Sequence, residues 1–145
     1  MTTTDTIHTC TRFFVRGYRD PVRAVWHYTS VDPLAVSLSL TSPHSGQTVE
    51  WVMARQLLGA ALQGRAGDGD VTLQVTAAGL VVDLSPPSGY LRLTGSPVVA
   101  RRFLERSFEV CPPCPAGWCG DCAECDAVAV ALDEVLETIE REAMW

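Results

Sequence analysis

The sequence predicts an α+β fold in which helices pack on antiparallel β-sheets, with the element order ββββα-βββα and a last helix at the end of the chain. Three observations support this prediction. Apolar and polar residues alternate with a period of two over much of the first half. At three places the period changes to that of an amphipathic helix. Short segments rich in Gly, Pro and Ser separate the alternating runs, as expected for antiparallel strands.

The first four strands are predicted by this alternation and by the turns between them. The even-numbered residues from Leu34 to Leu40 are apolar and their neighbours are small or polar, so one face of this strand is expected in the core. Residues 42–46 have the composition of a turn, which joins this strand to the next as a hairpin. The four predicted strands cover residues 13–18, 22–28, 34–41 and 48–52.

A helix, three strands and a second helix are predicted next. Apolar residues at 54, 57, 58, 61 and 62 have helical spacing, and Gly64 with residues 66–70 ends this helix. The segment Gly67–Asp70 is interpreted as a turn with a positive φ at glycine. Strands follow at 71–75, 80–84 and 90–93. Ser96 followed by Pro97 is typical of a helix start, so the second helix is expected from there to Phe108.

The last helix is predicted from about Asp126 to Ala143. Its apolar stripe lies between acidic residues and is made of Val128, Leu132, Val135, Leu136 and Ile139. Two interpretations remain open at this point. The helix either docks on its own domain or is presented to the groove of a partner.

Charge divides the chain in two. Residues 1–104 carry nine Arg and seven acidic residues, whereas residues 105–145 carry two Arg and ten acidic residues. The acidic segment argues against binding of nucleic acid there, because it repels phosphate. The longest apolar run, Ala127–Leu132, is far shorter than a membrane span of roughly 18 residues, so no span is expected. The start of the chain has no apolar core of a signal peptide, and we expect a cytoplasmic protein.

Five of the six cysteines lie close together, with the spacing C-x2-C-x4-C-x2-C-x2-C. Two C-x2-C pairs are typical of a structural zinc site, and the last three cysteines also match part of an iron–sulfur ligand run. Reversible disulfides and an unliganded, flexible linker remain alternatives. The candidate metal ligands are four of these five residues: Cys111, Cys114, Cys119, Cys122 and Cys125. The sixth, Cys10, is expected to be a small buried residue of a strand.

The sequence contains no pattern that is typical of an active site. His8, His27 and His44 have no helical or turn spacing to one another or to an acidic residue, so no catalytic triad can be assembled. Trp51 is expected to fill the core, with Arg55 covering it or pairing with Glu50. We therefore expect a non-enzymatic protein.

One alternative function is binding of single-stranded nucleic acid. Four arginines lie among aromatic residues near the start of the chain, an arrangement that suits phosphates and stacked bases. The basic residues are Arg12, Arg16, Arg19 and Arg23, and the aromatic residues are Phe13, Phe14, Tyr18 and Trp26. The net charge of −6 disfavours nucleic acid as a partner.

Several motifs resemble the SsgA-like sporulation and cell-division proteins of filamentous actinomycetes. Residues 31–36 are similar to the family's D-P-x-A-V segment, and residues 48–58 to V-E-W-x-x-A-R-x-L-L. Residues 67–71 resemble G-x-G-D-V, residues 82–89 resemble L-S-S-P-x-G, and the helix 97–104 resembles P-x-x-x-x-x-x-F-L. The motifs occur in the family's order, and the resemblance covers about residues 10–108.

The resemblance implies an interaction protein that controls where division septa form during sporulation. It implies partners such as the tubulin-like division protein FtsZ or SsgA-like paralogues, a fold similar to the whirly nucleic-acid-binding proteins, and self-assembly as a trimer. We accordingly expect an N-terminal tail (1–9), the SsgA-like domain (10–108), a Cys-rich linker or metal knuckle (109–125) and an acidic C-terminal helix (126–145). The Cys-rich segment is the part that departs from the family's pattern. A metal- or redox-responsive regulator is therefore a further alternative.

Overall fold

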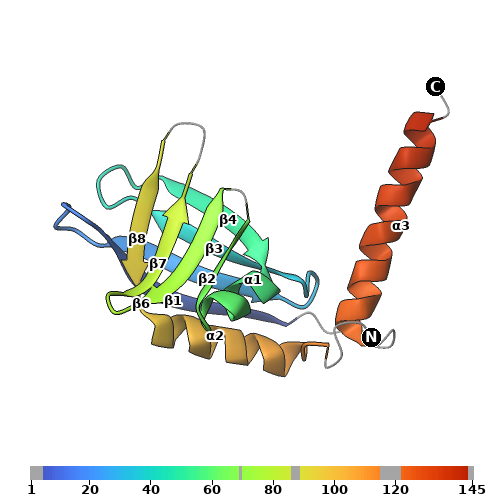
Figure 1. The fold of residues 1–145 in the computed structure, drawn as a ribbon, viewed down its shortest axis with the longest axis horizontal. Coiled ribbons are helices and arrows are strands. Elements are labelled where there is room, and N and C mark those ends of the chain that lie inside the picture. Colours follow the sequence, from blue (N-terminus) through green and yellow to red (C-terminus); the bar gives the residue numbers. More distant parts are fainter. Residues whose placement is uncertain (1–4, 69, 86–88, 115–121, 144–145) are drawn as a thin grey trace.

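The computed structural model describes residues 5–68, 70–85, 89–114 and 122–143. Within these residues the predicted α+β class is confirmed, with eight antiparallel strands in one curled sheet and three helices (Figure 1). The strand order across the sheet is β4-β3-β2-β1-β8-β7-β6-β5. Two halves of four consecutive strands thus meet at β1 and β8.

The first half is an antiparallel meander whose alternation matches the sequence. On β2, Trp26 lies opposite Thr9 of β1 and Leu38 of β3, and all three side chains share the inner face. Trp26 and Leu38 are completely buried. The strands are β1 (Thr6–Val15), β2 (Val22–Thr29), β3 (Ala35–Thr41) and β4 (Thr48–Ala54).

The first strand differs from its prediction. β1 begins at Thr6 and ends at Val15, whereas a strand was expected over residues 13–18. Polar side chains on both faces hide the alternation before Phe13, but this part of β1 pairs with β2 along its whole length. The prediction that Cys10 is buried is wrong, because Cys10 lies on the outer face with His8 and Arg12 and is exposed.

The second half contains one strand more than predicted. Residues Arg65–Asp68, which include part of the expected glycine turn, form the strand β5 and pair with β6. Gly67 has no positive φ, and Gly69, the other glycine of the expected turn, lies outside the described residues. The close approach of Gly67 to Thr72 across the hairpin is what requires glycine there. The other elements here are α1 (Arg55–Ala61), β6 (Val71–Thr76), β7 (Gly79–Leu84), β8 (Leu91–Gly95) and α2 (Pro97–Val110).

Helix α2 covers the inner face of the curled sheet. The Phe103 ring of this helix stacks on Trp26 with centroids 5.8 Å apart, and Phe13 contacts Trp26 edge-on at 6.3 Å. All three rings are fully buried, so they join β1, β2 and α2 in one core. The predicted helix start is confirmed: the Ser96 side chain accepts a hydrogen bond from the backbone N–H of Val99 at 3.2 Å, and Pro97 is the first helical residue.

The last helix, α3 (Ala123–Ala143), extends away from the rest of the molecule (Figure 1). Among its described residues, Glu124 and Cys125 are the two that are buried, and both lie in its first turn. Its apolar stripe is therefore exposed to solvent from Leu132 to Ile139, while Val128 is half-buried. In the described part of the chain, no helix is both long and apolar enough to cross a membrane.

The two halves of the sheet are joined where β1 leaves β2 and meets β8. Phe14 and Val15 pair with Thr94 and Leu93, directly after the last pair between β1 and β2. Gly95 ends β8 here, and a Cβ atom at this position would lie 2.6 Å from the Phe13 ring. Glycine therefore allows β8 to close over the buried aromatic residues.

We predict that Gly95→Ala lowers the free energy of unfolding by about 1–3 kcal/mol, because the added methyl group overlaps a ring that packing holds in place. Urea denaturation followed by circular dichroism measures this change. Gly64→Ala is the control, since a Cβ there meets nothing within 4 Å. Equal stability of the two variants would contradict the proposed role of the Gly95 contact.

Candidate functional site

A buried arginine lies where four elements meet. Arg55 begins α1 directly after β4, and 2% of its surface is exposed. Its Nη1 donates hydrogen bonds to the Tyr28 hydroxyl at 3.1 Å and to the carbonyl oxygens of Ser107 at 3.2 Å and Cys111 at 2.7 Å. The guanidinium carbon also lies 5.0 Å from the ring centroid of Phe108. Arg55 thus binds the carbonyl end of α2, where a helix carries unpaired acceptors and partial negative charge.

Tyr28 supports this arginine from the sheet. Its hydroxyl donates to the carbonyl oxygen of Pro33 at 3.2 Å and accepts from Arg55. Burial raises the pKa of Tyr28 above its ordinary value, although the guanidinium of Arg55 acts in the opposite direction. The hydroxyl therefore stays neutral and keeps both hydrogen bonds at physiological pH.

The counterion of Arg55 comes from the last helix. Glu124, in the first turn of α3, forms a buried salt bridge to Nη2 of Arg55 with one carboxylate oxygen. The other oxygen accepts a hydrogen bond from the backbone N–H of Cys114 at 2.8 Å. Burial raises the pKa of Glu124, but the hydrogen bonds from Arg55 and Cys114 outweigh that effect, and the pKa lies below its ordinary value. Glu124 is therefore an anion that holds α3 to the domain.

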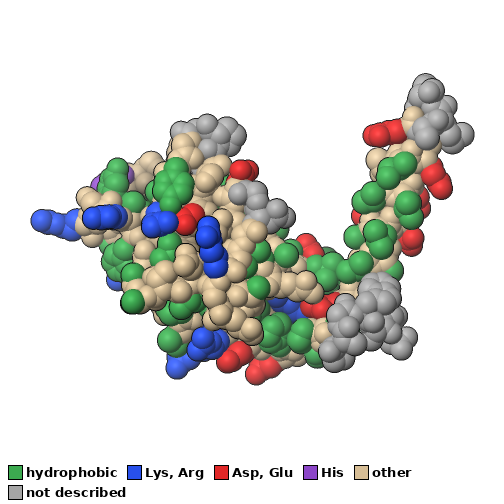
Figure 2. Space-filling model, in the orientation of Figure 1, with side chains coloured by type: hydrophobic (Ala, Val, Ile, Leu, Met, Phe, Trp, Pro, Cys, Tyr) green, Lys and Arg blue, Asp and Glu red, His purple; other side chains and the backbone are tan. Residues whose placement is uncertain are grey.

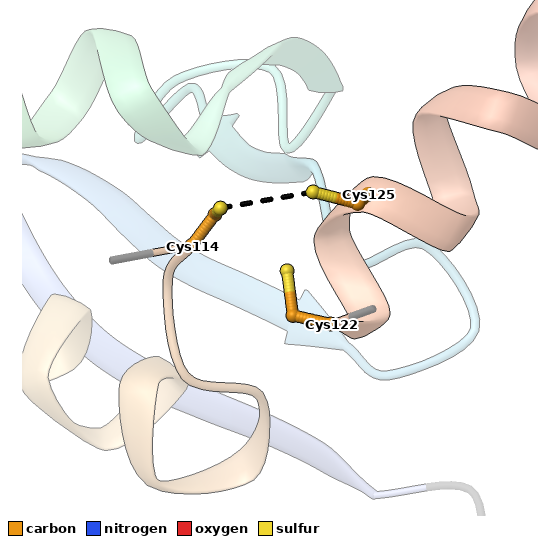
Figure 3. A group of neighbouring side chains, drawn as sticks. All are labelled: Cys114, Cys122 and Cys125. Atoms are coloured by element: carbon orange, nitrogen blue, oxygen red, sulfur yellow. Dashed lines mark hydrogen bonds between the residues drawn. The ribbon is translucent and has the colours of Figure 1, made fainter. Parts of the chain in front are cut away.

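Three thiols gather beside this salt bridge (Figure 3). The Sγ atoms of Cys114, Cys122 and Cys125 all lie within 4.8 Å of one another, and those of Cys114 and Cys125 are 3.6 Å apart. Cys114 follows α2, whereas Cys122 precedes α3 and Cys125 lies in its first turn. Two cysteines three residues apart at a helix start place both thiols on one side, facing Cys114. We call these three residues the thiol cluster.

The spacing in the thiol cluster suits a metal ion. A tetrahedral zinc site with Zn–S bonds of about 2.3 Å separates its sulfur atoms by roughly 3.8 Å. The separation of Cys114 and Cys125 is close to that value and is much longer than a disulfide bond of about 2.05 Å. Cys125 is buried and the other two are half-buried, which limits the access of water. The cluster could therefore bind a metal.

The structure brings together three of the five predicted metal ligands. Cys111 is buried next to α2, and its thiol contacts the carbonyl oxygen of Pro112 at 3.9 Å, outside the thiol cluster. Cys119 lies outside the described residues. A set of four ligands that includes the thiol cluster thus requires one more donor, and Cys119 is the cysteine whose position is not described.

The predicted partners of Arg55 are wrong. Trp51 is half-buried and lines an apolar pocket, and Glu50 is exposed on the outer face of β4 opposite Ser39. Arg55 instead binds Glu124, 69 residues along the chain. A charged residue at the start of a predicted helix is usually at the surface, so nothing in the sequence around Arg55 indicated this burial. The best available signal was an acidic residue between closely spaced cysteines.

Other sequence candidates are separated or rearranged. The aromatic residues near the four arginines are divided: Phe13 and Trp26 are in the core, whereas Phe14 and Tyr18 are exposed. Two of the three histidines, which have no spacing relationship in the sequence, lie on opposite positions of β1 and β2. The His8 and His27 ring centroids are 4.6 Å apart. The antiparallel pairing of β1 and β2 places these two residues opposite each other, which the spacing in the sequence does not show.

Comparison with known proteins agrees with this architecture. A family model described as the Streptomyces sporulation and cell division protein SsgA matches residues 22–114. The sporulation-specific cell division protein SsgB of Saccharopolyspora erythraea is 36% identical over 96 residues, which is 64% of this chain and 67% of that protein. The SsgB of Thermobifida fusca is 31% identical over 113 residues, covering 74% of this chain and 78% of that protein.

Solved structures are similar over most of the chain. A structure of SsgB of Streptomyces coelicolor, reported with mutations that correlate with longitudinal cell division during sporulation, has a TM-score of 0.66 at 30% identity. It covers 77% of this chain and 91% of that one. A structure of an SsgA-like protein from Thermobifida fusca has a TM-score of 0.68 at 23% identity. It covers 93% of this chain and 96% of that one, and at this identity it supports the fold alone. The family match ends at Cys114, so Cys122, Glu124 and Cys125 lie beyond it.

We predict that Glu124→Gln lowers the free energy of unfolding at pH 7 by about 3 kcal/mol, because it leaves the charge of Arg55 buried without a counterion. The pKa of Glu124 is lowered by folding, so its contribution is present above the unfolded pKa of about 4.3 and is lost as the pH falls through the lower folded value. The difference between wild type and variant should therefore shrink as the pH falls below the unfolded pKa of about 4.3. Urea titrations at a series of pH values measure it.

Glu137→Gln is the matched control in the same helix. Glu137 pairs with Arg141 at 3.9 Å, but both side chains are at least 70% exposed, and such pairs contribute about 0.5 kcal/mol or less. A loss at Glu124 that is as small as that at Glu137, or that does not depend on pH, would contradict the assigned role of the buried salt bridge.

Proposed function

The chain belongs to the SsgA family of sporulation and cell division proteins, and from that premise we propose that it controls the position of division septa as a non-enzymatic interaction protein. The observation that carries this proposal is the family match over residues 22–114, together with relatives named as sporulation-specific cell division proteins. Proteins of this family are generally non-catalytic. The proposed place of action is the cytoplasmic side of the septum.

The proposed partners are the division protein FtsZ or SsgA-like paralogues, with a trimer as the proposed state of self-assembly. Exposed apolar side chains support a function through surfaces. Tyr18, Val49 and Tyr90 are more than half exposed on the body of the protein, and Leu136 and Ile139 on α3 are equally accessible. Apolar groups that remain in contact with water are available to bind another protein.

We predict that the purified full-length chain, immobilised as bait, captures FtsZ or an SsgA-like paralogue from an extract of sporulating cells. An unrelated acidic protein of similar size is the control, because a net charge of −6 retains basic proteins without specificity. Deletion of the gene should displace sporulation septa, as seen with a fluorescent membrane dye. Capture of neither partner, together with normal septa in the deletion strain, would contradict the proposal.

We also propose that the thiol cluster holds a structural zinc ion, with an iron–sulfur cluster as the second choice. The supporting observation is that three thiols from two backbone segments lie within 4.8 Å of one another, with one pair at 3.6 Å, close to the tetrahedral value. Zinc bound here would tie the segment after α2 to the first turn of α3, beside the salt bridge of Glu124. Its proposed role is to fix the helix, because the three thiols join the segment after α2 to the first turn of α3.

Protein purified without chelator should contain about one zinc per chain by atomic emission. Cys122→Ser and Cys125→Ser each remove a predicted ligand and should reduce this content at least several-fold. Cys10→Ser is the matched control, since Cys10 is exposed on β1 and is not part of the thiol cluster. A content below about 0.2 equivalents of zinc or iron in the wild type would contradict both metal assignments.

A further inference from the structure

An apolar pocket opens at one end of the curled sheet. Its volume is about 540 Å³, and most of the side chains that line it are apolar. They come from the facing ends of β1 and β2 and the turn between them, from the hairpin of β3 and β4, and from β7 and β8. The lining residues used below are Val15, Tyr18, Val49, Trp51, Leu91 and Leu93. We call this feature the mouth of the sheet.

The mouth has basic residues beside it. Arg16 and Arg19 are exposed in the same turn as the lining residues Tyr18 and Asp20, so this turn carries two positive charges and one negative charge. Figure 2 shows basic side chains gathered at this end of the molecule, near exposed hydrophobic ones. Tyr18 and Val49 are 66% and 54% exposed, so the apolar lining reaches the surface. An occupant of the mouth should therefore combine an apolar face with acidic flanks.

Helix α3 has this combination of properties. Leu132, Val135, Leu136 and Ile139 are each 54–55% exposed and form one stripe. The helix contains seven acidic residues and one arginine, a net charge of −6. Figure 2 shows hydrophobic side chains along this helix with acidic side chains beside them. The stripe has no cover among the described residues.

The mouth of a chain is out of reach of its own helix. The salt bridge of Glu124 with Arg55 fixes the root of α3, and the turn between β1 and β2 lies at the opposite end of the molecule (Figure 1). A helix with a charge of −6 is also repelled by a second copy of itself. The body of the protein is a better match, since residues 1–104 carry an excess of two positive charges.

We propose that α3 of one copy docks in the mouth of a second copy, with its apolar stripe against the lining residues and its acidic flanks near Arg16 and Arg19. This contact joins two different surfaces and is therefore heterologous. Such contacts produce closed rings or open chains, depending on the rotation between successive copies. The ligand of the mouth is thus an acidic amphipathic helix, and its source is this same chain.

Two full-length variants test the proposal by complementation. Leu132→Glu places a charge in the stripe of α3, and Val49→Asp places one in the mouth; both positions are more than half exposed, so folding should be unaffected. The wild type should show a molar mass that rises with concentration in multi-angle light scattering and falls at high salt. Each variant alone should lose this association. An equimolar mixture should regain one contact, because an intact α3 from one variant meets an intact mouth in the other.

Matched controls lie on the opposite faces of the same elements. Val130→Glu on α3 and Val52→Asp on β4 change residues that are 58% and 62% exposed but outside the stripe and the mouth, and both should associate like the wild type. The double variant Leu132→Glu/Val49→Asp is the baseline. Its molar mass includes any self-association that does not use the stripe or the mouth.

Four results would overturn the proposal. The first two are a wild type with the same molar mass as the double variant, and single variants that associate like the wild type. The other two are control variants that no longer associate, and a mixture whose molar mass is no higher than that of its two components. The last result would indicate a symmetric contact of like surfaces. A small apolar molecule that co-purifies with the wild type, together with no effect of Val49→Asp on mass, would assign the mouth to that ligand instead.

Discussion

The placement of the last helix depends on one buried cation. Arg55 cannot leave its position at the start of α1, and water does not reach its guanidinium, so every charge around it must come from the protein. The sheet supplies a hydroxyl, α2 supplies two carbonyl oxygens, and α3 supplies a carboxylate. A single side chain thereby connects segments that are far apart in the sequence. Arg55 lies within the family match, whereas its counterion Glu124 lies beyond it.

The curled sheet places this cation and the mouth at different ends. β1 pairs with β2 over most of its length and with β8 at its last two residues, which turns two four-stranded halves into one surface. Phe13, Trp26 and Phe103 fill the space inside it. The aromatic core therefore fills the middle of the curled sheet, and α2 covers its inner face. At the mouth, apolar side chains remain in contact with solvent.

The sequence predicted elements well where one face of a strand is buried and the other is polar. β3 is such a strand, and Ser96 with Pro97 located the start of α2 because both residues have a local physical role. β5 was missed because Ala66 is its only apolar inward residue, and β1 because polar residues occupy both its faces before Phe13. The thiol cluster was predicted as a group, yet its membership depends on where α2 ends, which directs Cys111 away from it. The link from Arg55 to Glu124 is a contact between distant segments, and no local pattern encodes it.

The attachment of α3 through its first turn also makes the helix a lever. With 21 residues at a rise of about 1.5 Å each, its length is roughly 31 Å. A rotation of about 10° at the root moves the far end by about 5 Å, close to the rise of one helical turn. The thiol cluster and the salt bridge lie at the attached end of the helix. A small rotation there therefore displaces the apolar stripe by a distance that grows towards the far end. The bonds made at Cys125 and Glu124 therefore set which part of the stripe a neighbouring molecule meets.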